Sequence, residues 1–232
     1  MSDRSAASGF SGVVPVFPLP ELVFFPDALL PLHVFEPRYL AMVREARAGE
    51  GLLVVATLLP GWERDPGGAP AFHPVATVGH MVQVIDRPDG LLDILLHGRE
   101  RVALEEEFTD RPYRSAQARA LPDVPLPDDR PDIDDRVRRL FLTYEYAAHL
   151  AGRGGTTLLA TFGDDESAAR ETVIHTVCQN LAVPVIHKLR ALEASGPLAR
   201  AEMAEGWLRA ELDAALVARG LPRLKAGPGE LN

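Results

Sequence analysis

The sequence has little cysteine and no long apolar run. Its 232 residues include one cysteine, Cys178, so no disulfide can form within the chain, which suits a reducing compartment. No stretch approaches the roughly 20 apolar residues of a membrane-spanning helix. Residues 1–11 lack the basic and apolar segments of a signal peptide. We therefore expect a cytoplasmic protein that has no membrane partner.

Clustered basic charge is also absent. The chain carries 24 Lys and Arg against 33 Asp and Glu, which gives a net charge of −9. The basic residues are interspersed with acidic ones, as in Arg99-Glu100-Arg101. Proteins bind a phosphate backbone through grouped Lys and Arg side chains. Nucleic acid is therefore not an expected partner.

Motifs for catalysis or for cofactor binding are missing. The chain has no Gly-x-x-x-x-Gly-Lys-Ser/Thr segment, and Gly152-Arg153-Gly154-Gly155 lacks the lysine that would contact a triphosphate. His175 and Cys178 lie about one helical turn apart, but no zinc-type spacing accompanies them. The helical pattern places Cys178 inward and His175 on the polar side, which favours packing over a thiol–imidazole pair. We predict a non-catalytic protein without cofactor or metal.

Residues 12–121 have the pattern of a β-rich subdomain. Asp89-Gly90 between two apolar stretches is typical of a hairpin, and Gly79 within a third stretch suggests a bulge. A helix is expected from Pro37 to Gly49, because proline suits the first helical turn and glycine the C-terminal cap. Strands are expected at residues 13–17, 32–35, 52–59, 75–85, 91–96, 101–108 and 113–121.

A linker and a helical subdomain follow the β-rich half. Proline and aspartate dominate residues 122–131, which we expect to be the linker. Over residues 132–220 the apolar residues recur at helical spacing, with breaks at Pro184 and Pro197, which predicts a helical bundle. Residues 221–232 would form a tail. The predicted fold class is α+β, with a β-rich N-terminal subdomain followed by a C-terminal helical bundle.

Residues 19–31 form an apolar, proline-rich segment between the first two predicted strands. Because proline has no backbone N–H, this segment is unsuited to the middle of a sheet. Leu22, Phe24, Phe25 and Leu29 therefore form a candidate surface for an extended segment of another protein. The alternative is that these side chains close one end of the β core, where most large apolar residues lie.

Short motifs follow one another in a fixed order through the β half. They are Phe17-Pro18-Leu19-Pro20, Val23-Phe24-Phe25-Pro26, Leu30-Pro31-Leu32, Val34-Phe35-Glu36-Pro37-Arg38-Tyr39, Val78-Gly79, Gly98-x-x-Arg101, and Tyr113 with Ala116. These motifs, together with the layout of the helices behind them, resemble the N-terminal, substrate-binding domain of Lon proteases. The resemblance implies a PUA-like, partly closed β fold followed by helices.

The resemblance also implies recognition without turnover, of unfolded clients or of one fixed protein partner. In full-length Lon this region precedes an ATPase and a Ser-Lys protease domain, and neither has a counterpart in residues 1–232. A stand-alone form of the domain is therefore expected. Two alternatives remain, an RNA-binding PUA-like protein and a small-molecule site in the cleft between the subdomains. The acidic net charge disfavours the first.

Glu36, Arg38, Tyr39 and Arg101 lie inside the family motifs. Such residues could hold the terminus of a ligand, but partly buried charges more often form ion pairs within the fold. We expect all four to be structural. In particular, Glu36 or Arg38 should contact an opposite charge or a backbone group.

Overall fold

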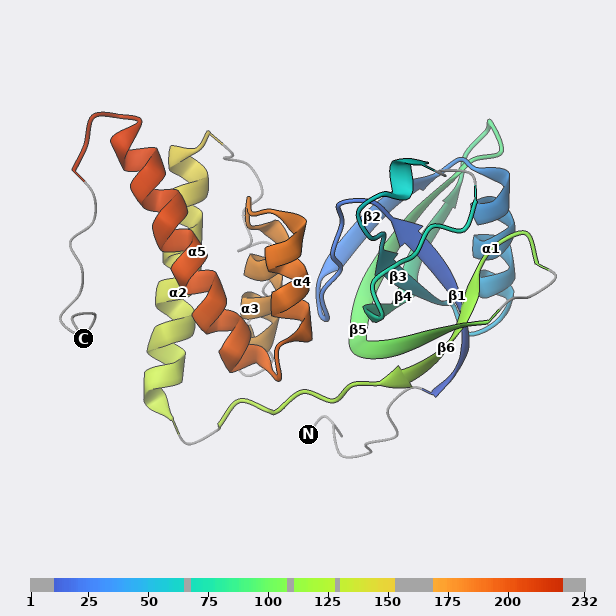
Figure 1. Ribbon diagram of the computed structural model, residues 1–232, viewed down its shortest axis with the longest axis horizontal. Helices are drawn as coiled ribbons and strands as arrows, with labels where there is room; N and C mark the ends of the chain where they lie inside the picture. Colours follow the sequence, from blue (N-terminus) through green and yellow to red (C-terminus); the bar gives the residue numbers. More distant parts are fainter. Residues whose placement is uncertain (1–10, 65–67, 108–110, 128–129, 153–168, 223–232) are drawn as a thin grey trace. The chain divides into compact units, whose positions relative to one another are not determined.

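The computed structural model describes residues 11–64, 68–107, 111–127, 130–152 and 169–222 (Figure 1). The chain forms two compact units, residues 1–124 with 185–195 and residues 125–184 with 196–232. The first contains β1 (Ser11–Leu19), β2 (Leu29–Val34), α1 (Pro37–Ala48), β3 (Leu52–Thr57), the 3-10 turn η1 (Trp62–Arg64), β4 (Val75–Asp86), β5 (Leu92–Glu107), β6 (Ser115–Ala120) and α4 (Val185–Glu193). The second contains α2 (Pro131–Leu150), α3 (Ala169–Asn180) and α5 (Pro197–Val217). The predicted α+β class is confirmed.

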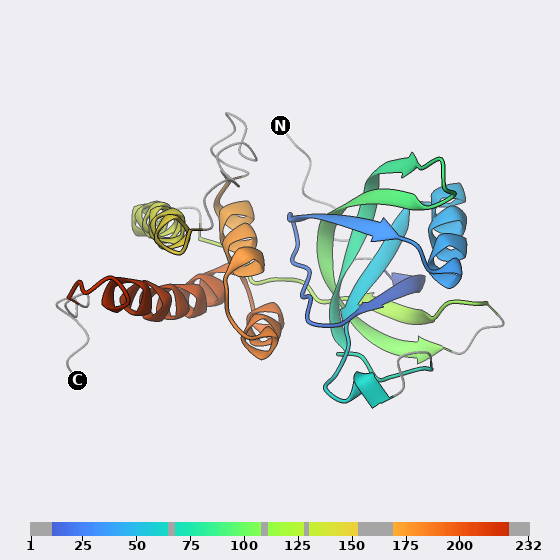
Figure 2. The ribbon, with the colours of Figure 1, turned by 90° about the horizontal axis from the view of Figure 1, so that it is seen from above.

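The strands of the first unit form one six-stranded sheet that curls into a partly closed barrel (Figure 2). The strand order is β2-β5-β4-β3-β1-β6, and β5 also pairs with β6. The first half of β5 pairs with β2 and its second half pairs with β6. This length lets β5 close the ring at one end, while β2 remains outside the closed part. The sheet is antiparallel apart from the parallel pair of β1 and β3.

Mainly valine and alanine side chains fill the barrel. They come from alternate positions of β1, β3, β4, β5 and β6, because successive residues of a strand point to opposite faces. These buried residues are Val14, Val16, Val54, Ala56, Ala76, Val78, Val102, Leu104, Ala116 and Ala118. The helix α1 packs against β1 and β3 outside this core. Its Pro37 start matches the prediction, and at its end the Gly49 N–H bonds to the Ala46 carbonyl.

Gly98 lies inside β5, where the sequence predicts a break between two strands. Its N–H donates to the Ala28 carbonyl and its own carbonyl accepts from the Asp27 N–H, both at 2.9 Å. The chain before β2 therefore approaches the β5 backbone closely, and a side chain at this position would collide with it. The glycine serves this approach rather than a turn. The predicted bulge at Gly79 is corrected: the register shifts beside Gly79, but the extra residue is Arg99 in β5, whereas the extra residue in β4 is Val82.

In the second unit α2, α3 and α5 pack against one another. Cys178 is buried, as predicted, but His175 is buried as well, which corrects its predicted place on the polar side. The ring nitrogen Nε2 of His175 lies 2.8 Å from Nη1 of Arg200, whose side chain is fully buried. A guanidinium only donates hydrogen bonds, so Nε2 of His175 is the acceptor in this contact.

The helix α4 groups with the β-rich unit, although the sequence suggested one bundle over residues 132–220. The guanidinium of Arg101 donates to the Leu192 carbonyl at 2.8 Å. Glu193 lies 3.3 Å from the His73 imidazole, and the Val124 N–H donates to the Ser195 carbonyl at 2.8 Å. These contacts fasten α4 to the barrel. None of the described helices is long and apolar enough to cross a membrane, and no candidate metal-binding cluster occurs among the described residues.

Candidate functional site

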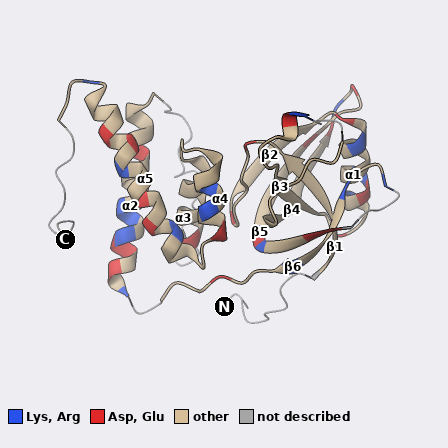
Figure 3. Cartoon of the chain, in the orientation of Figure 1, with Lys and Arg blue, Asp and Glu red and all other residues tan. Residues whose placement is uncertain are grey.

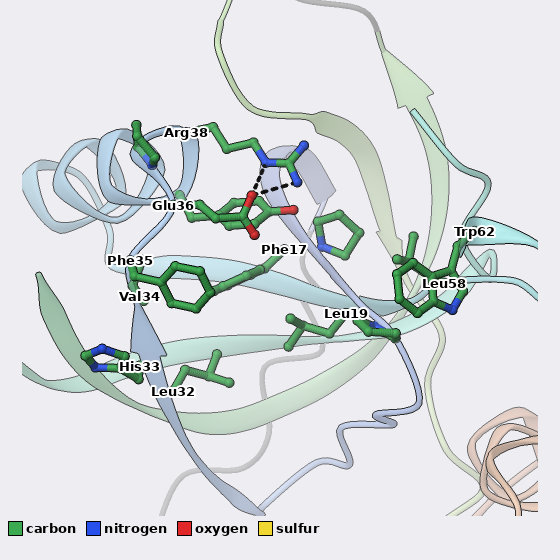
Figure 4. A pocket seen from close by; sticks show the side chains of 14 residues that line it. Phe17, Leu19, Leu32, His33, Val34, Phe35, Glu36, Arg38, Leu58 and Trp62 are labelled. Carbon is green, nitrogen blue, oxygen red and sulfur yellow. Dashed lines mark hydrogen bonds and ion pairs between the residues drawn. The ribbon is translucent and has the colours of Figure 1, made fainter. Parts of the chain in front are cut away.

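An open pocket of about 840 Å³ lies between the ends of β1 and β2 in the first unit (Figure 4). We call it the β1–β2 pocket. Its walls are residues 17–20, residues 32–39, Leu58 and Trp62. Its volume falls in the range of roughly 300–1,000 Å³ that is usual for ligand sites.

The pocket exists because the barrel is open between two strands. β1 pairs with β6 as far as Pro15, and the Val16 N–H still donates to the Arg114 carbonyl. The last residues of β1 pair with β3 alone, and β2 pairs with β5 alone. Leu32 is partly exposed at this opening. It shares a face of β2 with buried neighbours but is only half-buried.

Apolar and aromatic side chains dominate the walls of the β1–β2 pocket. Phe17 is buried and packs on the Tyr39 ring, with ring centroids 4.4 Å apart. Phe35 is 60% exposed at the mouth of the pocket, and its ring stacks on His33 with centroids 6.2 Å apart. Together with the apolar walls of the pocket, this ring forms a contiguous apolar surface, and such surfaces often mark a site for another molecule.

Glu36 and Arg38 form an ion pair at the pocket wall. Nε of Arg38 donates to Glu36 Oε2 at 2.9 Å, and Nη2 lies 2.8 Å from the same oxygen. The guanidinium also lies 4.6 Å from the centre of the Tyr39 ring. Burial raises the pKa of Tyr39 above its ordinary value of 10.0, while the Arg38 charge lowers it. The prediction that Glu36 or Arg38 contacts an opposite charge is confirmed.

His33 belongs to a second charged group beside the pocket. Its Nδ1 lies 2.6 Å from Asp93 Oδ1, and Nη1 of Arg87 donates to Asp93 Oδ2 at 2.9 Å. These hydrogen bonds, first that of His33 and then that of Arg87, hold the pKa of the Asp93 carboxyl below its ordinary value of 3.8. The carboxylates of Glu36 and Asp93, at the pocket and beside it, thus each have a basic partner.

The Asp93 carboxyl gives a direct pH prediction. Because its pKa is lower in the folded chain, its contribution to stability is complete above the unfolded pKa and is lost as the pH falls through the folded pKa. An NMR titration of Asp93 should give a midpoint below 3.8. His33→Ala should raise that midpoint, and Arg38→Ala should leave it in place. An unchanged midpoint in His33→Ala would contradict the assignment.

The predicted surface at Leu22, Phe24, Phe25 and Leu29 needs correction. Phe24 and Phe25 are 1% and 0% exposed, so their rings are closed to a partner. The Phe24 ring packs on Gly79, and its carbonyl accepts a hydrogen bond from Thr77 Oγ1 at 2.6 Å. Their burial agrees with the alternative interpretation, in which these rings belong to the β core. Leu22 is half-buried and Leu29 is exposed, and neither lines the β1–β2 pocket.

The surroundings of Arg101 agree with the expected structural role. Its side chain is 5% exposed, and Nη2 lies 2.5 Å from an Asp123 carboxylate oxygen. Leu32, Phe35 and Trp62 are among the pocket residues that sequence reasoning missed as candidates. The signal for Phe35 was its position, a large ring just after a strand and just before the Pro37 start of a helix, where neither element buries it.

Comparison with known proteins identifies the family. A family model described as the ATP-dependent protease La (LON) substrate-binding domain matches residues 13–210. The chain belongs to the Lon substrate-binding domain family. The predicted resemblance is therefore confirmed, and membership supports a role in substrate recognition.

Curated relatives are whole Lon proteases. The Lon protease of Rhizobium meliloti is 24% identical over 91% of this chain, and that of Brucella melitensis is 26% identical over 90%. The chain spans 26% and 25% of the length of these two proteins. The matches thus cover only the substrate-binding region, which is not the catalytic part of a Lon protease.

Solved Lon domains share the fold. The N-terminal domain of a Mycobacterium avium complex Lon protease superposes with a TM-score of 0.60 at 15% identity, over 85% of this chain and 98% of that one. A Lon N-terminal domain protein from Xanthomonas campestris gives a TM-score of 0.58 at 24% identity, over 84% and 98%. These likenesses support the PUA-like, partly closed barrel followed by helices.

Proposed function

We propose that this Lon-family domain binds apolar segments of other proteins in the β1–β2 pocket and carries out no reaction on them. The observation that supports this most strongly is the exposed Phe35 ring at the mouth of an open, apolar pocket. Unfolded clients, or one fixed partner with an accessible apolar segment, would supply such a segment. Membership of a substrate-binding family agrees with a protein ligand.

The affinity for unfolded clients should be modest. An unfolded segment loses conformational freedom when it binds, and this cost offsets part of the gain from apolar burial. A native protein keeps its apolar side chains inside and offers few of them to the pocket. The domain should therefore distinguish unfolded from native forms of the same protein without needing ATP.

The RNA-binding alternative receives no support from the charges. Figure 3 shows Lys and Arg mixed with Asp and Glu along α1, α2 and α5 rather than gathered on one stretch. A phosphate backbone would need a grouped basic surface. The family match likewise favours a protein ligand over RNA or a small molecule.

A binding comparison tests the proposal. We expect the chain to bind reduced, carboxymethylated lysozyme and not native lysozyme in fluorescence anisotropy. Phe35→Ser should weaken that binding roughly five- to ten-fold, because it removes an exposed aromatic anchor. Its fold should persist, since the ring is 60% exposed.

The matched control is Val82→Ser, which removes an apolar side chain that is 51% exposed in β4 and does not line the pocket. Its affinity should equal that of the unaltered chain. Equal binding of native and unfolded lysozyme, or a Phe35→Ser variant that binds like Val82→Ser, would refute the proposal.

A further inference from the structure

The β1–β2 pocket is bordered by backbone as well as by apolar side chains. β2 ends the sheet order, so one of its edges faces no described strand. Such an edge presents backbone N–H and C=O groups that another extended chain can pair with. The mode of binding can therefore be inferred from the register of β2.

The register decides which groups of β2 point outward. In an antiparallel pair, residues alternate between those that hydrogen-bond to the neighbour and those that do not. Gly98 on β5 donates to the Ala28 carbonyl, so Leu30 and every second residue after it bond to β5. Pro31 and His33 consequently direct their backbone groups away from β5. The outer edge thus offers the Pro31 carbonyl and the N–H and carbonyl of His33.

The facing edge of β1 offers fewer backbone groups for hydrogen bonding than β2 does. The Val16 N–H points toward Arg114 near β6, and the Leu19 carbonyl accepts from Leu58 on the β3 side. By alternation Pro18 points its backbone to the same side as Val16, but proline has no N–H. That edge supplies a carbonyl and no donor at this position. β2 is therefore the better template for a strand.

We propose that a short, uncharged peptide segment adds to the outer edge of β2 as a strand, with its apolar side chains in the β1–β2 pocket. This rests on the proposed function and specifies its ligand. The backbone of the segment would pair with Pro31 and His33, and its side chains would contact Leu32 and Phe35. Binding of this kind recognises an extended backbone, so many sequences can satisfy it.

The charge of the pocket selects an uncharged segment. Glu36 is paired with Arg38, and Asp93 is paired with both His33 and Arg87. A charged side chain entering the pocket would lose water and find these charges already matched. Polar and apolar neutral residues carry no such cost. A segment without charged side chains therefore suits the pocket best.

The two prolines keep the pairing short. Pro31 and Pro18 each remove one donor from an edge that borders the pocket, and proline on an edge strand discourages long strand pairing. Capture limited to a few residues is reversible. The same feature lowers the tendency of two copies to join through β2.

N-methylated peptides test strand addition without altering the protein. The probe is fluorescent acetyl-Thr-Val-Thr-Leu-Thr-Val-Thr-amide. In an extended chain the N–H groups of the Val and Leu residues point to one edge, and those of Thr point to the other. One isomer carries N-methyl groups on both Val residues and a second on two inner Thr residues, so the number of methyl groups is equal.

We expect one isomer to bind the full chain at least ten-fold more weakly than the other, because only one edge of the peptide pairs with β2. If both isomers bind as tightly as the parent peptide, strand addition is refuted, while binding of an apolar segment in the pocket still holds. If the parent peptide itself does not bind, the proposed function fails too.

A pair of variants tests the same edge from the protein side. His33→Pro removes the outward N–H, and His33→Ala keeps it while removing the same side chain. We expect His33→Pro to bind the parent peptide at least five-fold more weakly than His33→Ala. Circular dichroism checks that both variants fold. Equal affinities of two folded variants would count against pairing at His33.

Discussion

Replacing Gly98 by alanine is expected to destabilise the β-rich unit by roughly 3 kcal/mol. A Cβ at this position would overlap the Phe25 carbonyl oxygen and lie 3.1 Å from the Cα of Pro26. Both neighbours are backbone, so no rotation of a side chain can relieve the overlap. Two hydrogen bonds, from Asp27 to Gly98 and from Gly98 to Ala28, hold the segments together at 2.9 Å. Urea unfolding followed by circular dichroism measures the loss.

Alanine substitutions at two other glycines of the same unit provide comparisons for the loss of stability at Gly98. At Gly49 a Cβ would meet its nearest atom, a carbonyl oxygen, at 3.7 Å, so Gly49→Ala should change stability by less than about 1 kcal/mol. At Gly79 the Cβ would lie 2.8 Å from a ring carbon of Phe24, which can shift, so the loss should be intermediate. If Gly98→Ala were no more destabilising than Gly49→Ala, the close backbone approach at β5 would be wrong.

Features that depend on local chemistry were predictable from the sequence. The helix that begins at Pro37 follows from its flanking proline and glycine, and the structure places it at Pro37–Ala48. The hairpin at Asp89-Gly90 follows from the positive φ that such turns need, and Gly90 has φ of 81°. In both cases the decisive residues lie within a few positions of the feature.

Features that depend on distant segments were not predictable. The reason for Gly98 lies in residues 25–28, about seventy positions earlier in the chain. The burial of each phenylalanine was not predictable either, because a ring inside the core and a ring that faces solvent are equally hydrophobic. Phe24 and Phe25 are buried, and the Phe24 ring packs on Gly79 of β4, whereas Phe35 follows the end of β2 and is 60% exposed.

The packing of α4 on the β-rich unit was also not predictable from the sequence. An amphipathic pattern shows that a helix has an apolar face but not which surface the face packs on. The partners that decide this are the polar contacts of Arg101, His73 and Val124 with the C-terminal end of α4. None of these residues stands out in sequence as a partner of a helix near residue 190.

Arg101→Ala is expected to destabilise the β-rich unit by roughly 3 kcal/mol. The guanidinium is 5% exposed, with Nη2 2.5 Å from Asp123 and Nη1 2.8 Å from the Leu192 carbonyl. Alanine would remove both donors and leave a cavity, while Asp123 would keep a largely buried charge. Since Leu192 is in α4, the variant should also speed proteolysis between residues 185 and 195. Urea unfolding and limited proteolysis measure the two effects.

The control is Arg47→Ala, which breaks an exposed ion pair with Asp86. The Arg47 and Asp86 side chains are 53% and 68% exposed, and pairs of this kind contribute at most about 1 kcal/mol. Arg101→Lys should recover only part of the stability, because one ammonium cannot reproduce the fork that joins Asp123 and Leu192. Equal losses in Arg101→Ala and Arg47→Ala would mean that Arg101 does not fasten α4 to the barrel.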